Sequence, residues 1–321
     1  MSKSRAWIRD FTLRDLDRFR RDLEKVRDKE FREITRTRFA SPGFLDEIRS
    51  ELLHGRGFVL LRGIDLETFS IDEAARIFWG IGANLGRALP QNAKGHVIGH
   101  VKDMGLRADD PNVRLYQTTE RQGFHTDSCD LVGLLCLAKA RRGGLSSLAS
   151  TWTAFNEVMR RRPDLAGALF EPIATDHRGE HPPGARPWFS IPVFNWHRKK
   201  LIGMYQRRYI ESAQRFADAP RLSDRQEQAL TLLDEVLEEI AIQMALEPGD
   251  IQLVHNHQIL HDRTAFEDDP KRPRHLLRLW LSPRDGWPLP PVFAERFGTV
   301  TPGKRGGIRI PGLALAASLS P

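Results

Sequence analysis

The sequence contains very little cysteine and no long apolar run. Only two cysteines, Cys129 and Cys136, occur among its 321 residues, which excludes the disulfide framework that holds many small secreted domains together. No stretch reaches the roughly 18–20 uncharged apolar residues that a membrane-spanning helix requires. The N-terminal segment also lacks the apolar core of a secretory signal. These absences predict a cytoplasmic protein with no membrane partner.

The positive charge is not concentrated in one segment. Lys and Arg number 49 against 42 Asp and Glu, which gives a net charge of +7. In the N-terminal segment "RDLDRFRRDLEKVRDKEFREITRTR" basic and acidic residues alternate, which is typical of a solvated helix face. The sequence shows no platform of interleaved aromatic and basic residues. We therefore expect a small-molecule substrate and no nucleic-acid partner.

The order of the expected elements favours an antiparallel barrel of two sheets with added helices over a parallel α/β sheet. No glycine-rich nucleotide loop joins a strand to a helix. Helices are expected over 9–55, with a cap at Ser41-Pro42, and over 70–86, 152–162 and 223–246. Strands are expected over 55–65, 96–101, 113–118, 131–138, 145–150, 251–263 and 274–283. Residues 189–196 and 200–206 are expected to form a hairpin.

The stretch "GFHTDSCD" contains a candidate half of a metal site. A spacing of two on a strand points His125 and Asp127 to the same face, although this pattern also recurs by chance among loop residues. His261 ends an apolar strand just before "DR". Two imidazoles and one carboxylate leave open cis positions that suit Fe(II). His255 and His257 compete for the same role, because strand alternation does not separate them from His261.

Two arginines follow on the last expected strand. Arg274 and Arg278 are four residues apart, so both can face the barrel interior. A buried arginine requires an anionic partner. A dicarboxylate cosubstrate would supply one through bidentate hydrogen bonds.

The motifs "FHTD", "GGLS", "PGDI…N…LHDR" and "RHLLRLWL" resemble, in order and spacing, the taurine dioxygenase-like (TauD/TfdA) family from about Gly55 to Trp280. The resemblance implies a mainly β (α+β) protein with a double-stranded β-helix, or jelly-roll, core. It also implies Fe(II), the cosubstrate 2-oxoglutarate, and O₂. We expect one domain over residues 1–321, with an N-terminal helical extension (1–54), a core with a helical insertion (about 55–285) and a C-terminal tail (286–321).

By position, the resemblance implies that the iron-ligating and catalytic residues are His125, Asp127 and His261. It implies that Arg274 pairs with the distal carboxylate of 2-oxoglutarate. Arg278 matches an arginine that holds the cosubstrate in some members and reaches the substrate in others.

A serine stands where the family often has threonine. Ser146 in "GGLS" keeps the hydroxyl donor for 2-oxoglutarate, and the neighbouring Ser147 and Ser150 remain alternatives. Related halogenases replace the iron-binding carboxylate with a small residue, so the presence of Asp127 disfavours halogenation.

The implied reaction is hydroxylation of an unactivated C–H bond with release of succinate and CO₂. Desaturation or cyclisation with the same cofactors is one alternative, and a metal-binding barrel without oxygenase activity is another. The substrate is expected to be amino acid-like, acidic or a natural-product intermediate. The sequence leaves homo-oligomerisation open, since homo-oligomers are common. Residues expected to line the substrate pocket are Gln91, Asn92, Tyr116 and Gln117.

Overall fold

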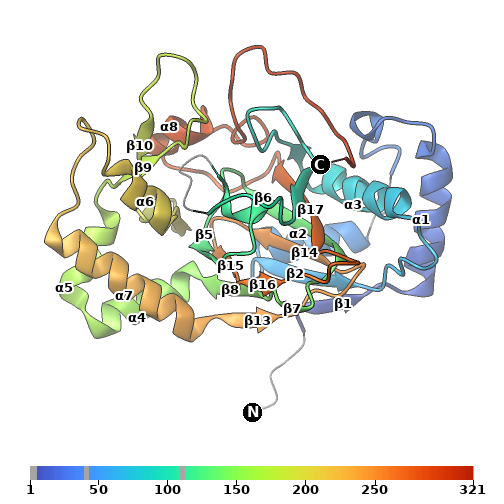
Figure 1. Cartoon of the computed structure of the whole chain (residues 1–321), viewed down its shortest axis with the longest axis horizontal. Coiled ribbons are helices and arrows are strands. Elements are labelled where there is room, and N and C mark those ends of the chain that lie inside the picture. Colours follow the sequence, from blue (N-terminus) through green and yellow to red (C-terminus); the bar gives the residue numbers. More distant parts are fainter. Residues whose placement is uncertain (1–5, 40–42, 109–112, 321) are drawn as a thin grey trace.

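Two mainly antiparallel sheets face one another at the centre of the molecule. The computed structural model describes residues 6–39, 43–108 and 113–320, so the cap expected at Ser41-Pro42 lies outside the described residues. Figure 1 shows strands of the two sheets at the centre and helices on either side. The larger sheet has the order β1-β2-β14-β6-β17-β3, and β4 also pairs with β17. Its strands are β1 (Ile8–Asp10), β2 (Phe58–Arg62), β3 (Arg87–Ala88), β4 (Gly99–Val101), β6 (Leu131–Ala138), β14 (Ile251–His255) and β17 (His275–Ser282).

The smaller sheet carries the side chains that matter most for the site. Its order is β13-β8-β15-β5. Its strands are β5 (Gln122–His125), β8 (Ser146–Ser150), β13 (Ile242–Met244) and β15 (Ile259–Arg263). The remaining described strands form three two-stranded sheets: β7 (Arg142–Gly143) with β16 (Phe266–Glu267), β9 (Ala174–Asp176) with β10 (Trp188–Ser190), and β11 (Phe194–His197) with β12 (Lys200–Gly203).

Alternation along the strands divides the core into layers. On β14, Leu253 packs outward with the helices, whereas Val254 packs with residues that lie between the two sheets. The inner layer joins both sheets, since Leu276 of the larger sheet clusters with Leu148 and Ile259 of the smaller one. This alternation is expected for strands of a two-sheet barrel.

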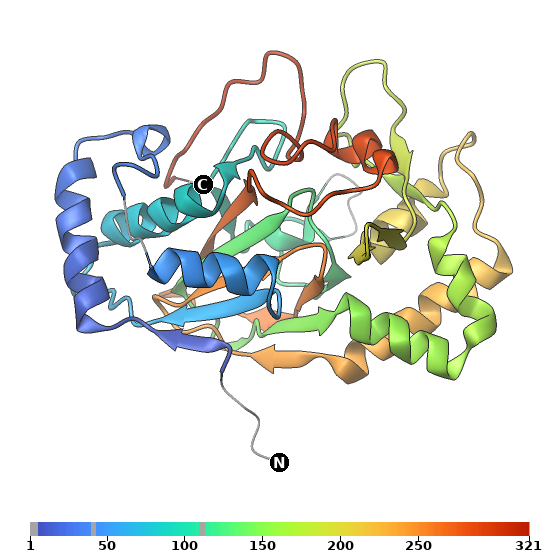
Figure 2. The same ribbon diagram turned by 180° about the vertical axis from the view of Figure 1, so that it is seen from behind.

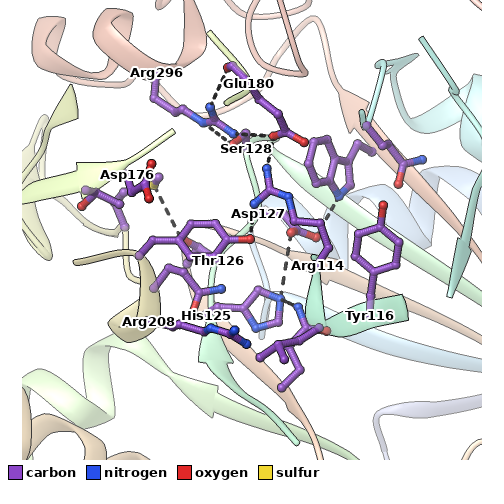
Figure 3. A pocket seen from close by; sticks show the side chains of 18 of the residues that line it. Arg114, Tyr116, His125, Thr126, Asp127, Ser128, Asp176, Glu180, Arg208 and Arg296 are labelled. Carbon is purple, nitrogen blue, oxygen red and sulfur yellow. Dashed lines mark hydrogen bonds and ion pairs between the residues drawn. The ribbon is translucent and has the colours of Figure 1, made fainter. Parts of the chain in front are cut away.

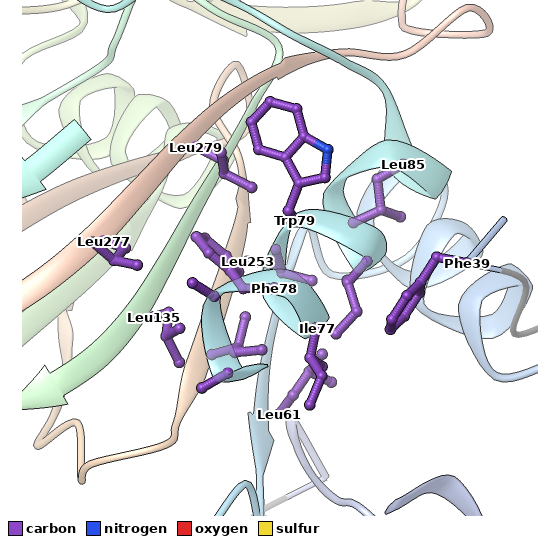
Figure 4. Close-up of a cluster of buried hydrophobic side chains, with 14 of the residues drawn as sticks. Phe39, Leu61, Ile77, Phe78, Trp79, Leu85, Leu135, Leu253, Leu277 and Leu279 are labelled. Carbon is purple, nitrogen blue, oxygen red and sulfur yellow. The ribbon is translucent and has the colours of Figure 1, made fainter. Parts of the chain in front are cut away.

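Three N-terminal helices cover the outer face of the larger sheet (Figure 2). They are α1 (Leu13–Val26), α2 (Phe44–Leu53) and α3 (Ile71–Leu85). Ser70 caps α3 in a reciprocal capping box with Glu73. Phe78 of α3 packs among Leu253, Leu277 and Leu279 (Figure 4). At Gly80 a Cβ atom would lie 2.3 Å from the Phe39 ring, so glycine at this position allows α3 to pack closely against Phe39.

A second group of helices covers the smaller sheet. The helices are α4 (Thr151–Arg161), α5 (Pro163–Ala166), α6 (Arg207–Ala213) and α7 (Asp224–Ile240), and a last one, α8 (Ala294–Phe297), lies in the C-terminal segment. Leu230, Leu233 and Leu237 of α7 are fully buried in a cluster with residues of α4. Short 3₁₀ turns span Phe31–Glu33, Leu115–Gln117, Gly167–Phe170 and Pro291–Phe293. Among the described helices, none combines the length and apolar character needed to cross a bilayer.

The structure corrects several expected elements. The segment 9–55 begins with a strand, β1, because its residues pair in parallel with β2. Within residues 113–118, Leu115–Gln117 form a 3₁₀ turn and no strand is present. The long helix ends at Ile240 because Ile242–Met244 pairs with β8. The segment 251–263 is two strands, β14 and β15. Tertiary pairing outweighs local propensity in each case.

Candidate active site

The structure brings His125, Asp127 and His261 together on the smaller sheet. His125 ends β5 and is the direct cross-strand partner of His261 on β15. Potential ligand atoms of the three residues lie within 4.8 Å of one another. The Nε2 atoms of His125 and His261 are 3.9 and 3.7 Å from carboxylate oxygens of Asp127. All three side chains are buried.

The protonation of this cluster suits a divalent metal. Burial and the neighbouring His261 lower the pKa of His125 to about 3, so its imidazole is neutral at pH 7. Its Nδ1 lies 2.9 Å from the Gly123 carbonyl, which directs Nε2 toward the cluster. Burial alone would raise the pKa of Asp127, but the Arg278 guanidinium and the two histidines hold it well below its usual range. Two imidazoles and one carboxylate are a donor set that Fe(II) accepts.

Asp127 is held by both its side chain and its backbone. The indole N–H of Trp280 donates to Oδ2 over 2.8 Å, and Arg278 Nη1 lies 3.5 Å from the same oxygen. The Asn256 side chain accepts from the Asp127 N–H at 2.8 Å and donates to the Asp127 carbonyl at 2.6 Å. These contacts fix the carboxylate before any metal binds.

The two competing histidines lie away from the cluster. His257 is fully buried and its Nε2 is 3.0 Å from Asp130. His255 packs against the Trp287 ring, with centroids 4.5 Å apart. Asp130 also receives hydrogen bonds from Arg305, whose side chain is completely buried. His257 therefore holds Asp130, three residues after Asp127, and neither histidine belongs to the cluster of potential metal ligands.

One cavity, of about 480 Å³ including its open mouth, extends from the two cluster histidines to Arg274. Arg274 is 4% exposed, and its Nη1 finds no hydrogen-bond partner among the described residues. Burial lowers its pKa to about 10. Ser146 lines this cavity. Of the alternative serines, Ser147 accepts a hydrogen bond from Gln243 and Ser150 caps α4.

A second cavity, of about 740 Å³ including its open mouth, borders His125 and Asp127. Of the residues expected to contact substrate, Gln91 and Tyr116 line this cavity, whereas Asn92 and Gln117 are not among its lining residues. The Asn92 side chain instead accepts hydrogen bonds from the backbone of its own turn. Arg278 lies between the cavities and lines both.

Sequence reasoning missed several charged residues of this second cavity. Arg114 lies within the expected strand 113–118, Arg208 follows the expected hairpin, and Arg296 lies in the expected C-terminal tail. All three line the cavity together with Glu180 and Tyr209. In Figure 3 dashed lines join Glu180 to Arg114 and Arg296 at the pocket wall. The only signal in the sequence is the residue type, because these residues come from three distant segments.

Comparison with known proteins agrees with this architecture. Residues 29–280 match the taurine catabolism dioxygenase TauD, TfdA family. FR-33289 synthase of Streptomyces rubellomurinus is 34% identical over 253 residues, 75% of this chain and 73% of that protein. The taurine hydroxylase-like protein SAT17 of Stachybotrys chartarum is 31% identical over 261 residues, 77% of this chain and 66% of that protein.

A solved structure shares the fold. The structure of asparagine oxygenase with Fe(II), 2S,3S-3-hydroxyasparagine and succinate superposes with a TM-score of 0.69 at 15% identity, over 86% of this chain and 93% of that one. Its fold likeness agrees with the match to the family over most of the chain. The chain therefore belongs to the TauD, TfdA family of Fe(II)- and 2-oxoglutarate-dependent dioxygenases.

Proposed function

We propose that this dioxygenase hydroxylates an unactivated C–H bond of a small molecule, with iron held by His125, Asp127 and His261. The observation that carries the proposal is the position of these three side chains between two cavities. One cavity ends at a buried arginine with a free donor, and the other is large enough for a small organic substrate. A hydrolytic metal centre would have no use for the first cavity.

Arg274 and Ser146 are proposed to bind the distal carboxylate of 2-oxoglutarate. A guanidinium that is 4% exposed and lacks a carboxylate partner among the described residues is costly unless an anion neutralises it. Ser146 now donates to the Gln252 amide oxygen at 3.0 Å, and its hydroxyl can turn toward a ligand in the same cavity. Arg278, which lines both cavities, is proposed to border cosubstrate and substrate.

The bound iron, with 2-oxoglutarate and O₂, supplies the oxidising power that removes a hydrogen atom from the substrate and yields succinate and CO₂. The chain supplies orientation and water exclusion. Trp280 and Asn256 hold Asp127 in place, and Gly123 orients His125. The proposal places the reaction in the cytoplasm, where the two buried cysteines remain thiols.

Anaerobic titration with Fe(II) and 2-oxoglutarate tests this function. We expect a weak visible charge-transfer band in the wild-type protein. The His125→Ala and Asp127→Ala variants should lose the band and succinate formation while they retain the far-UV circular dichroism of the wild type. Absence of the band in the wild type, together with no calorimetric binding of 2-oxoglutarate, would refute the proposal.

A further inference from the structure

The wall of the substrate cavity carries more positive than negative charge. Arg114, Arg208 and Arg296 line the cavity, and none of them belongs to the proposed iron or cosubstrate sites. Two further arginines lie close behind this wall. Arg178 stacks over the Tyr209 ring, with its Cζ 5.3 Å from the ring centroid, and Arg215 pairs with Asp176 at 2.8 Å.

Glu180 neutralises only part of this charge. It forms ion pairs with both Arg114 and Arg296. Arg114 also donates to the Tyr209 hydroxyl, and Arg296 donates to the Ser128 hydroxyl at 2.7 Å. The side chains of the two arginines are only 13% and 7% exposed. One carboxylate is thus shared by two desolvated guanidinium groups.

The remaining arginines have even less compensation. Arg208 donates to the Ala108 carbonyl and makes no ion pair with any residue that the structure describes. The Nε of Arg178 is buried without a hydrogen-bond partner among the same residues. The Asp176 carboxylate is already bonded to Arg215 and Ser212.

The cluster therefore has a net positive charge. The cluster contains five guanidinium groups and two carboxylates, those of Asp176 and Glu180. Three positive charges are therefore uncompensated within the described part of the chain. The five arginines are Arg114, Arg178, Arg208, Arg215 and Arg296. His177 adds none, because burial and Arg296 lower its pKa to about 3. Partly desolvated positive charges that lack partners are stabilised by a bound anion.

We propose that the arginine wall, formed by Arg114, Arg208 and Arg296 at the cavity surface, binds a tetrahedral dianionic group of the substrate, either a phosphate monoester or a phosphonate. A singly charged carboxylate would leave two of the three positive charges uncompensated, whereas a dianion neutralises more of them and offers three oxygens to guanidinium donors. This inference rests on the proposed function, since it takes the cavity beside the iron ligands as the substrate site.

The rest of the cavity indicates how the substrate lies. Apolar side chains border the space beside the arginine wall, so an apolar body fits there and a C–H bond can lie next to the iron ligands. The arginine wall would then select the substrate and set which carbon is oxidised. The apolar lining residues are Val113, Leu115, Phe189, Met204 and Trp280.

Calorimetric titration with four short probes tests the inference. At a pH above the second pKa of both compounds, propylphosphonate and propyl phosphate are dianions, whereas butyrate and 1-propanesulfonate are monoanions of similar length. The protein is first saturated anaerobically with Fe(II) and 2-oxoglutarate, so that Arg274 is occupied. We expect both dianions to bind about tenfold or more tightly than either monoanion, as one additional charge-assisted contact predicts. Comparison of the two dianions distinguishes an ester from a phosphonate.

Two neighbouring arginines provide the variant and its control. Arg208→Gln removes a cavity guanidinium and should weaken propylphosphonate binding about tenfold or more. Arg207→Gln removes a guanidinium that pairs with Glu211 and Glu227 and does not line the cavity, so its affinity should equal that of the wild type. Equal affinity for dianions and monoanions, or an unchanged affinity in Arg208→Gln, would overturn the inference.

The failure of this inference is distinguishable from failure of the proposed function. The charge-transfer band and the binding of 2-oxoglutarate report on iron and cosubstrate alone. If both are present but the dianions show no preference, only the arginine wall has been misassigned. If neither is present, the same titration on the metal-free protein decides whether the arginine wall still selects dianions.

Discussion

The indole nitrogen of Trp280 lies 2.8 Å from Oδ2 of Asp127 and donates its proton to that oxygen. Trp280 is on β17 of the larger sheet, whereas Asp127 follows β5 of the smaller one. This hydrogen bond therefore crosses the barrel and sets the orientation of a proposed iron ligand from the opposite sheet. Hydrogen bonds of this kind determine how firmly a carboxylate holds its metal.

Replacement of Trp280 by Phe should weaken iron binding. The change keeps an aromatic ring in the core but removes the donor, so Oδ2 of Asp127 loses its fixed direction. We expect the Fe(II) dissociation constant to rise about tenfold or more, measured by anaerobic titration of the charge-transfer band. Trp196→Phe, at a side chain that is 58% exposed, is the matched control. Unchanged iron affinity in Trp280→Phe would show that the indole donor is dispensable.

Arg274→Gln should raise the requirement for 2-oxoglutarate and leave iron binding unaltered. The substitution removes the buried guanidinium at the end of the first cavity. We expect the apparent KM for 2-oxoglutarate to rise about tenfold or more, measured by succinate release. Arg272→Gln, two residues earlier on an exposed turn, should behave like the wild type. An equal increase in both variants would exclude a specific role for Arg274.

Arg305→Met should strongly destabilise the fold. The Arg305 side chain is completely buried and neutralises Asp130, so its loss leaves a buried carboxylate without its cation. We expect a loss of about 3–5 kcal/mol in the free energy of unfolding, measured with denaturant. The double variant with Asp130→Asn should recover part of that loss, because no charge is then left unpaired. If the double variant is less stable than Arg305→Met, charge is not the cause.

His177 should make stability fall in acid. Burial and Arg296 lower its pKa to about 3 in the folded protein, against about 6.5 in an unfolded chain. Between these values the unfolded state binds more protons, so the free energy of unfolding decreases as pH falls from about 6.5 toward 3, by at most about 1.4 kcal/mol per pH unit.

Replacement of His177 by Asn tests this pH dependence. Asn keeps a hydrogen-bond acceptor near Arg296 but does not titrate, so the variant should lose less stability than the wild type between pH 6.5 and 4.5. Denaturant unfolding at several pH values provides the comparison. His54→Asn, on an exposed histidine, should retain the wild-type slope. Parallel curves for the wild type and His177→Asn would contradict the assignment.

The local parts of the structure could be predicted from the sequence. Ser70 and Gly86 mark the ends of α3 because capping depends on neighbouring residues alone. His125 and Asp127 share a side because their spacing matches the strand repeat. By contrast, the helical pattern continues past Ile240, and only pairing with β8 reveals that Ile242–Met244 is a strand.

The arginine wall could not be predicted in the same way. Arg114, Arg208 and Arg296 come from a 3₁₀ region, the start of α6 and α8, which meet only in the folded chain. No spacing rule connects such segments, and the residue type alone does not indicate whether an arginine side chain is buried. Asn92 is the opposite case. The sequence predicts that it lines the substrate pocket, but its side chain accepts hydrogen bonds from the backbone of its own turn.

The pairing of His125 with His261 has a consequence for folding kinetics. The two residues are direct partners across β5 and β15, although 136 positions separate them in the chain. A contact of such high sequence separation forms late, because the entropy of closing the loop is lost before the contact stabilises it. An unfolded chain presents only the His125–Asp127 half of the site. Stable iron capture should therefore follow strand pairing during refolding, and the rate at which tight metal binding appears would measure completion of the smaller sheet.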